Sequence, residues 1–264
     1  MAAIAQARQV LLNNIANAQT NGYKRRLVSF ESAADRPMTS LVPEHPLQIR
    51  FGLPVDVGAR LAPVVCDMAS GKLAATNRPL DLAIEGPGFF HLVDGQKKRD
   101  VYTRRGRFVF NKSGQLALAA TGEEWIVEPV VTIPTGVHTV EISSDGQVRG
   151  WNAEKHTSST FGSLQTACFP APSALIPSDG TFFIPPDGAS QDVRSPGVSG
   201  HGFLRQGYLE ESNVDVKHEL EDLARLAAQL QILEQAARLL QPNGLDRSSI
   251  PTEAVTPGAP GSLP

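Results

Sequence analysis

The sequence predicts an α+β fold in which the N- and C-terminal helices pair as a coiled-coil-like stem and a central all-β domain lies between them. Apolar residues recur at helical spacing at both ends of the chain and with period 2 in the middle, where turn signals are frequent. With 264 residues, 41% of them hydrophobic, the chain is long enough to bury a core. The expected segments are an N-terminal helical segment (1–26), an extended tether (27–70), the central β domain (71–203), a C-terminal helical segment (204–241) and a disordered tail (242–264).

The N-terminal helix is expected over residues 2–19. Its apolar positions recur every three or four residues, at Ile4, Ala7, Leu11, Ile15 and Ala18. The pattern ends at Thr20-Asn21-Gly22, where asparagine and glycine tolerate the left-handed conformation that closes a helix. Three cations follow and suit the negative end of the helix dipole, namely Lys24, Arg25 and Arg26.

The tether is proline-rich and is expected to be an extended strip that lies on another part of the protein. Prolines recur in it too often for a helix interior, at Pro37, Pro43, Pro46 and Pro54.

The central segment is expected to be a β-meander, because short apolar runs alternate with turn signals. Phe89 to Val93 precede Asp94-Gly95, and Val137 to Ile142 are separated from Gln147 to Trp151 by a Ser-Asp-Gly turn. Asn111-Lys112-Ser113 matches a glycosylation sequon, but we interpret it as a turn.

The C-terminal helix has the strongest periodic signal in the chain. Its stripe consists of Val216, Leu220, Leu223, Leu226, Ala227, Leu230, Leu233, Ala237 and Leu240. Asn213 or Asp215 is expected to cap its start, and Glu219 suits the positive end of the dipole. The two terminal stripes leave apolar surface beyond their mutual contact, which indicates self-association.

Several classes of function are disfavoured. The 24 Lys and Arg against 27 Asp and Glu give a net charge of −3, which argues against a nucleic-acid partner. Apolar runs are too short to span a membrane, and the N-terminus lacks the pattern of a cleaved signal peptide. No motif for catalysis, a small-molecule substrate, a metal or another cofactor is found. The adjacent carboxylates Glu210 and Glu211 are expected to be solvated, and Cys66 and Cys168 to be small buried hydrophobes.

An amide-rich stretch from Asn13 to Lys24 is the most informative part of the chain. Asparagine is a poor helix former, yet Asn13, Asn14 and Asn17 fall within the expected helix. Their amides either set the register between neighbouring helices or are solvated on the outer face.

This stretch resembles the N-terminal signature of the bacterial flagellar rod and hook family, Asn-Asn-x-Ala-Asn-x-x-Thr-x-Gly-Tyr-Lys. Two further blocks resemble the family in the same order: Asp81 to Phe90 with Tyr102 to Phe108, and Leu204 to Val216. Within the family, the chain length and the absence of a second β domain look most like members that form the distal rod. Proximal rod and hook members are the alternatives.

The resemblance implies a structural subunit, not an enzyme, that polymerises helically into the drive shaft carrying torque from motor to hook. It implies that the paired helices form an inner tube, that the β domain forms the outer layer, and that Asp35 to Leu53 stiffen the tube. The expected location is the periplasm-spanning rod of the basal body, reached by export without a cleaved signal. Expected partners are copies of itself, other rod proteins, the hook protein, the P- and L-ring proteins and the flagellar type III export apparatus.

The resemblance also implies three sets of site residues. Subunit-interface residues of the N-terminal segment are Ile4, Leu11, Asn13, Asn14, Ile15, Asn17, Thr20, Gly22, Tyr23 and Lys24. Those of the C-terminal helix are Val216, Leu220, Leu223, Leu226, Leu230, Leu233 and Leu240. Residues of a structural motif in the β domain are Gly86, Gly88, Phe89, Phe90, Tyr102, Gly106 and Phe108. The alternative from another class of function is a cell-wall glycan-binding β module with oligomerising helices.

Overall fold

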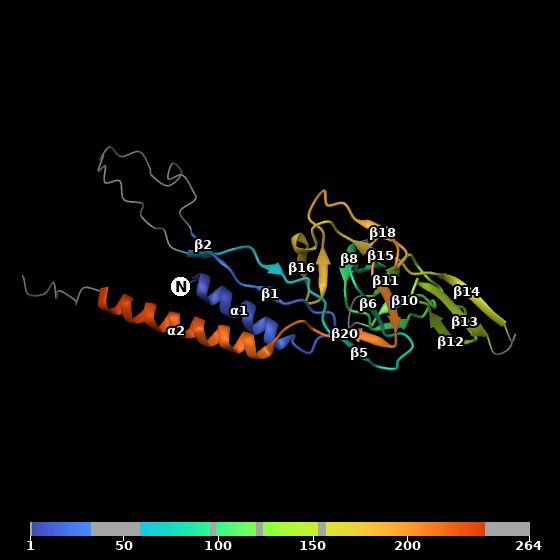
Figure 1. Ribbon diagram of the computed structural model, residues 1–264, viewed down its shortest axis with the longest axis horizontal. Coiled ribbons are helices and arrows are strands. Elements are labelled where there is room, and N and C mark those ends of the chain that lie inside the picture. Colours follow the sequence, from blue (N-terminus) through green and yellow to red (C-terminus); the bar gives the residue numbers. More distant parts are fainter. Residues whose placement is uncertain (1, 33–58, 96–98, 120–123, 153–156, 241–264) are drawn as a thin grey trace, which may run out of the picture. The chain divides into compact units, whose positions relative to one another are not determined.

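Helices α1 (Ala2–Ala16) and α2 (Val216–Leu240) stand near the two ends of the chain, and short strands fill the sequence between them (Figure 1). The computed structural model describes residues 2–32, 59–95, 99–119, 124–152 and 157–240. Contacts divide the chain into two units, Met1–Leu226 and Ala227–Pro264. The first unit holds α1, the described strands and the first turns of α2. An α+β fold is therefore confirmed.

Helix α1 is shorter than the 2–19 predicted, because the asparagines that follow it redirect its hydrogen bonds. The Asn17 side chain donates to the Asn13 carbonyl at 2.8 Å, and the next turns close over three residues, with the Thr20 amide donating to the Asn17 carbonyl at 3.0 Å. Gly22 has φ +72°, so the left-handed residue that the sequence predicts at this point is confirmed.

Helix α2 begins at Val216 because Asp215 caps it. The Asp215 carboxylate accepts the amide N–H groups of Lys217 at 3.0 Å and His218 at 3.4 Å. Of the two predicted caps, Asp215 is the one used. Every described side chain of α2 beyond Leu226 is exposed or half-buried.

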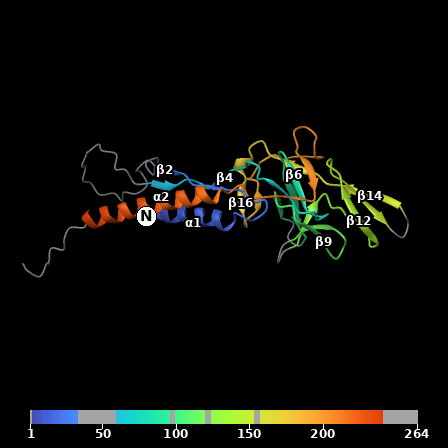
Figure 2. The ribbon, with the colours of Figure 1, turned by 60° about the horizontal axis from the view of Figure 1, so that its bottom comes forward.

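The start of α2 lies beside α1, as both ribbon views show (Figures 1 and 2). Ala7 and Leu11 of α1 form a small buried cluster with Leu226 of α2, and Ile4 and Leu223 pack against it. The two helices therefore share a core at this level, and coiled-coil pairing along their whole length remains a prediction.

The two described ends of the tether are extended and pair with each other. Strand β1 (Arg26–Leu27) is antiparallel to β4 (Val65–Cys66), and β2 (Phe30–Ser32) is antiparallel to β3 (Ala59–Leu61). The segment from Asp35 to Leu53 and the tail 242–264, both singled out in the sequence, lie outside the described residues.

The β body is built on an antiparallel sheet whose strand order is β16-β17-β8-β7-β11-β10-β9. Its strands are β7 (Phe90–Asp94), β8 (Asp100–Thr103), β9 (Phe108–Phe110), β10 (Leu116–Leu118), β11 (Trp125–Glu128), β16 (Ile176–Ser178) and β17 (Phe182–Ile184). A second antiparallel sheet contains β12 (Val137–Ile142), β13 (Gln147–Asn152) and β14 (Thr157–Ser163), which confirms the predicted hairpin around the Ser-Asp-Gly turn.

Smaller pairs complete the body. They are β5 (Leu73–Ala75) with β20 (Tyr208–Glu210), β6 (Leu82–Glu85) with β19 (Phe203–Gln206), and β15 (Thr166–Cys168) with β18 (Asp192–Arg194), and a 3-10 turn, η3 (Pro172–Ala174), follows β15. The domain boundary predicted at 203/204 falls within β19. Residues 203–210 belong to the body, because their alternating pattern pairs them with β6 and β5.

Two apolar clusters hold the body together. The larger runs from Leu82 to Leu204 and includes Phe90 and Phe108, whose rings meet edge to face at 5.1 Å. The smaller surrounds Phe89 and includes Tyr102 and Cys66. Neither contains a residue of α1 or α2. No helix in the described part of the chain has the length and hydrophobicity needed to cross a membrane.

A candidate structural site where the two ends of the chain meet

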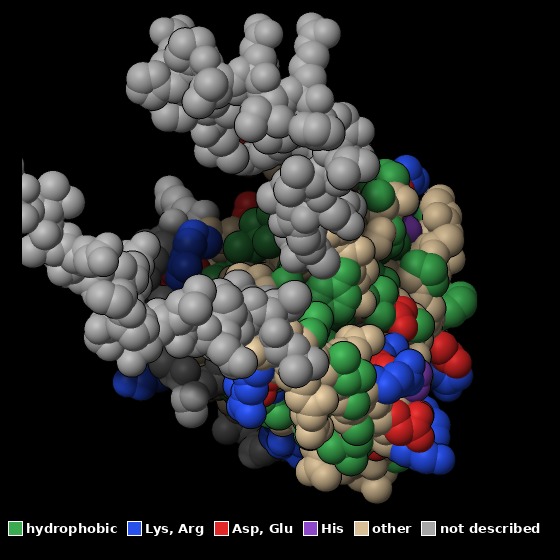
Figure 3. Space-filling model, turned by 90° about the vertical axis from the view of Figure 1, so that its left-hand side faces the viewer, with side chains coloured by type: hydrophobic (Ala, Val, Ile, Leu, Met, Phe, Trp, Pro, Cys, Tyr) green, Lys and Arg blue, Asp and Glu red, His purple; other side chains and the backbone are tan. Residues whose placement is uncertain are grey.

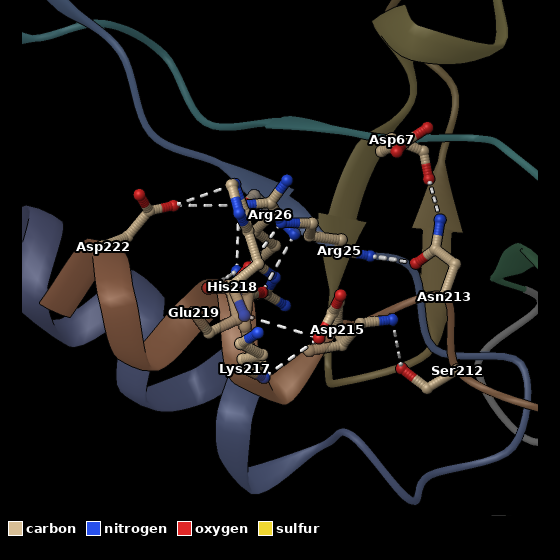
Figure 4. A network of polar contacts seen from close by, with 12 residues as sticks. Arg25, Arg26, Asp67, Ser212, Asn213, Asp215, Lys217, His218, Glu219 and Asp222 are labelled. Atoms are coloured by element: carbon tan, nitrogen blue, oxygen red, sulfur yellow. Dashed lines mark hydrogen bonds and ion pairs between the residues drawn. The ribbon is translucent and has the colours of Figure 1, made fainter.

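Three chain segments come together between the helices and the β body: the loop 17–25, the connection 67–72 and the connection 210–215. We call this region the joint. The Asp67 amide donates to the Arg25 carbonyl at 2.8 Å, and the Arg25 amide donates to the Asn213 side chain at 2.7 Å (Figure 4). The Asn213 amide group in turn donates to the carbonyls of Asp67 and Ala69, at 2.9 and 3.1 Å. One asparagine side chain therefore ties all three segments together.

Asn14 is the centre of a first polar cluster on the side of the helices. It is fully buried, and its amide group donates to the Arg26 carbonyl at 2.8 Å and to Glu219 at 2.9 Å. Its side-chain oxygen accepts the Tyr23 hydroxyl at 3.0 Å and the Arg26 amide at 2.9 Å. Since every hydrogen-bonding position of this amide is used, Asn14 fixes α1 against both α2 and the loop. Asn13 and Asn17 bond only within their own segment.

Glu219 completes this cluster. Its side chain is fully buried in the first turn of α2, where it also accepts the Arg25 guanidinium. A second guanidinium nitrogen of Arg25 lies 3.3 Å from Asp222 (Figure 4). The sequence predicts Glu219 only as a complement to the helix dipole, and the structure shows that it is the partner of a cation from the other end of the chain.

Glu210 is the centre of a second cluster, on the side of the body. Its carboxylate lies 2.6 Å from the Lys24 ammonium and 3.4 Å from the Arg104 guanidinium, and it accepts the Gly71 amide at 2.8 Å. Lys24 also donates to the Ala69 carbonyl at 2.7 Å. The prediction that Glu210 is solvated is wrong, because it is 1% exposed. Its neighbour Glu211 is exposed, as predicted.

Burial perturbs the ionisation of the loop. It lowers the pKa of the Lys24 ammonium, and the charge of Glu210 opposes that shift. Burial also raises the pKa of Tyr23 to about 12, because the charged form would be desolvated.

The Tyr23 shift gives a testable dependence of stability on pH. The folded state holds the tyrosine proton more tightly than the unfolded state, so its stabilising contribution is complete below pH 10 and is lost as the pH rises from 10 to about 12. The loss is about 1.4 kcal/mol per pH unit in that window. Urea unfolding at pH 9 and pH 11 should show a steeper loss in the native protein than in Tyr23→Phe. Equal losses in the two proteins would contradict a buried, protonated Tyr23.

Gly22 places this loop directly against the body. Its amide donates to the Glu210 carbonyl at 2.8 Å, and a Cβ added to it would lie 2.4 Å from the Arg105 backbone nitrogen. Positive φ and close backbone approach both require glycine here. The Gly-Tyr-Lys sequence is thus a docking turn in which Gly22 approaches the body while Tyr23 and Lys24 enter the two clusters.

Comparison with known proteins shows what kind of chain carries this joint. The family profile described as flagellar hook protein FlgE/F/G D1 domain matches residues 83–150, which lie in the β body. A flagellar basal-body rod protein FlgG of Buchnera aphidicola subsp. Baizongia pistaciae is 32% identical over 218 residues, 80% of this chain and 81% of the relative. This chain belongs to the flagellar basal-body rod protein family. The predicted family membership is confirmed.

Two further relatives bear on the position of this rod protein within the family. The rod protein FlgG of Agrobacterium fabrum is 30% identical over 226 residues, 81% of this chain and 82% of the relative. The flagellar hook protein FlgE of Treponema pallidum is 32% identical over 131 residues, but these are only 46% of this chain and 27% of the hook protein.

The predicted interface residues of this rod protein fall into three classes of exposure. Buried within the chain are Leu11, Asn14, Gly22, Tyr23, Lys24 and Leu226. Half-buried are Ile4, Asn13, Ile15, Asn17, Thr20, Leu223 and Leu230. Exposed are Val216, Leu220 and Leu233, whereas the side chain of Leu240 lies outside the described part. The side chains of the first class are buried by other parts of the same chain. Contacts with other subunits remain a prediction for all three classes.

The predicted β motif surrounds the second cluster and the core beneath it. The Arg104 guanidinium lies over the Phe89 ring at 5.2 Å and donates to the Gly86 carbonyl at 2.8 Å. Phe90, Tyr102 and Phe108 are core residues, and Gly88 and Gly106 approach Thr166 and Leu82 closely. Sequence reasoning missed Arg104, Glu210, Asn213 and Glu219 as site residues, although the first three fall within the blocks that resemble the family.

Neither cysteine is in a disulfide: Cys66 is buried, as predicted, and Cys168 is only half-buried. Burial raises the pKa of both thiols. Among the described residues, no group of three or more His, Cys, Asp or Glu side chains is arranged to hold a metal ion.

Proposed function

We propose that this rod protein is a structural subunit of the distal part of the flagellar rod, where copies of it polymerise helically into a shaft that carries torque from motor to hook. The observation that carries this proposal is the extent of the match. Rod relatives align over about four fifths of both chains, whereas the hook protein aligns over 27% of its own length.

The apolar face of α2 supports polymerisation with copies of the same chain. Val216, Leu220 and Leu233 repeat along the predicted helical stripe and are 40%, 51% and 47% exposed. On the face drawn in Figure 3, hydrophobic side chains are exposed among charged ones. Exposed leucines that recur along one helix favour burial against a neighbouring subunit.

The remaining partners follow from a place in the rod. We propose contacts with other rod proteins, with the hook protein and with the P- and L-ring proteins, and export by the flagellar type III apparatus without cleavage of a signal. The role is mechanical and not enzymatic. None of the relatives named above favours the glycan-binding alternative.

The direct experiment is electron microscopy of basal bodies from a strain in which the gene is deleted, with and without the gene restored on a plasmid. Truncated rods without hooks, rescued by the gene, are the expected result. Complete rods and hooks in the deletion strain would refute the proposed function.

The assignment of the α2 stripe can be tested in the same strain. Leu220→Asp with Leu233→Asp should abolish rod completion, because two buried charges per subunit contact would oppose packing. The purified monomer should keep its circular dichroism spectrum and melting temperature, since both side chains are exposed in the single chain. Gln229→Asp with Gln231→Asp adds the same charge at other exposed positions of α2 and should be tolerated. Normal rods from the leucine double variant would show that this stripe is not the contact.

A further inference from the structure

A pocket of about 360 Å³ lies beside the joint, between the connection 67–72 and the turn that leads into β7. Its walls are mostly apolar, and Met68, Phe89, Phe169 and Pro172 contribute to them. The rings of Phe89 and Phe169 meet edge to face at 6.0 Å. A pocket of this size and lining is suited to a small apolar group.

One charged side chain, that of Arg104, also lines this pocket. Only 5% of the side chain is exposed. Its terminal nitrogens donate to the carbonyls of Ile84 at 3.3 Å and Gly86 at 2.8 Å, but its buried Nε has no hydrogen-bond acceptor among the described residues. A guanidinium carries five N–H donors and a permanent charge, so a buried one with an unused donor favours a further acceptor.

The charge of Arg104 is incompletely balanced. The Glu210 carboxylate lies 3.4 Å from the Arg104 guanidinium, but the same carboxylate lies 2.6 Å from the Lys24 ammonium. One negative charge therefore serves two buried cations, and the shorter contact is the one with Lys24. Buried cations are stable only where negative charge and acceptors surround them. The wall of the pocket thus carries positive charge for which a ligand can supply the counterpart.

We propose that this pocket binds a carboxylate carried on an apolar group. The carboxylate would lie against the Arg104 guanidinium, which matches it in geometry and charge, and the apolar group would lie among Met68, Phe89 and Phe169. An acidic side chain of a second copy and a free organic acid share this chemistry. The binding chemistry does not depend on the proposed place in the rod.

Titration of the full chain with phenylacetate, followed by NMR of the arginine Nε–H groups, tests the proposal. The Arg104 resonance is identified as the one that disappears in Arg104→Met. Phenylacetate should shift this resonance saturably, with a Kd of about 1 mM or lower. Phenylacetamide and phenethylammonium have the same ring without the negative charge. They should bind at least about tenfold more weakly, because charge-assisted hydrogen bonds are the stronger ones.

A pocket-filling variant keeps the test independent of whether Arg104→Met folds. Ser70 is exposed and lines the pocket, so Ser70→Trp should obstruct it and weaken phenylacetate binding by at least about tenfold. Ser113→Trp is the matched control, because Ser113 is exposed in the turn between β9 and β10, and it should bind like the native protein. Three outcomes would overturn the proposal: no saturable shift at up to about 10 mM phenylacetate, equal binding of the three compounds, or equal binding by the two tryptophan variants.

Self-association of the chain, measured by sedimentation velocity, distinguishes the two sources of the carboxylate. If an acidic side chain of a second copy occupies the pocket, phenylacetate should weaken self-association and phenylacetamide should not, because only the acid competes for the site. If self-association is unchanged while phenylacetate binds, the site takes a free organic acid.

Discussion

Replacing Gly106 with alanine is expected to prevent stable folding of the β body. A Cβ at this position would lie 1.6 Å from the Leu82 carbonyl oxygen and 2.7 Å from its carbon, both of them backbone atoms that no rotamer change can move. The Leu82 amide also donates to the Gly106 carbonyl at 2.9 Å, so separating the two segments would break this bond. Displacement of a buried strand by more than an ångström should lower the free energy of unfolding by about 4 kcal/mol or more.

The matched control for Gly106→Ala is Gly95→Ala. The nearest atom to a Cβ on Gly95 is a side-chain methyl of Ile126 at 3.6 Å, an ordinary contact distance. This control should change stability by less than about 0.5 kcal/mol. Urea unfolding of both variants measures the difference. A Gly106→Ala protein as stable as the control would show that the segments are farther apart than the structure places them.

Replacing Glu210 with glutamine should give the largest loss among changes at the joint. The substitution keeps the shape of the side chain but removes the carboxylate that, among the described residues, contacts the buried cations Lys24 and Arg104. Breaking a buried ion pair by removing one partner lowers stability by about 3–5 kcal/mol. Thermal or urea unfolding should show this loss, and Glu211→Gln, at the exposed neighbouring position, should show almost none.

A double variant separates the charge effect from loss of shape. Adding Lys24→Met to Glu210→Gln removes one of the two uncompensated cations, so the double variant should be more stable than Glu210→Gln alone. Such coupling is the signature of two residues in direct contact. If the two losses simply added, the pair would not be interacting in the folded protein.

Periodicity and turn chemistry predicted most of the fold. The stripes of α1 and α2 and the β-meander were visible as local repeats, and Gly22 was predictable as a left-handed residue because it follows asparagine at the end of a helix. These features depend on neighbours within a few positions. The end of α1 was missed, because side-chain bonds of Asn17 compete with helical ones.

The candidate site was only partly predictable, because its partners are remote in sequence. Asn14, Tyr23 and Lys24 stand out in an amide-rich motif, but no local pattern distinguishes Glu210 or Glu219 from a solvated carboxylate. Charged residues are rarely buried unless they are paired. The cations that pair with Glu210 and Glu219 in the folded protein lie 186 and 194 residues away in the sequence.

The form of the joint bears on how the protein responds to twisting. Two covalent connections, 67–72 and 210–215, lead from the helices and strands β1 to β4 into the body, and Asn213 and the loop 17–25 hold these connections together. A single flexible linker would let the two parts swivel freely. Two connections set side by side must instead wind around each other when one part rotates, and the bonds of Asn213, Glu210 and Lys24 would have to break first. Each subunit therefore has torsional rigidity at the point where its helices and its β body are joined.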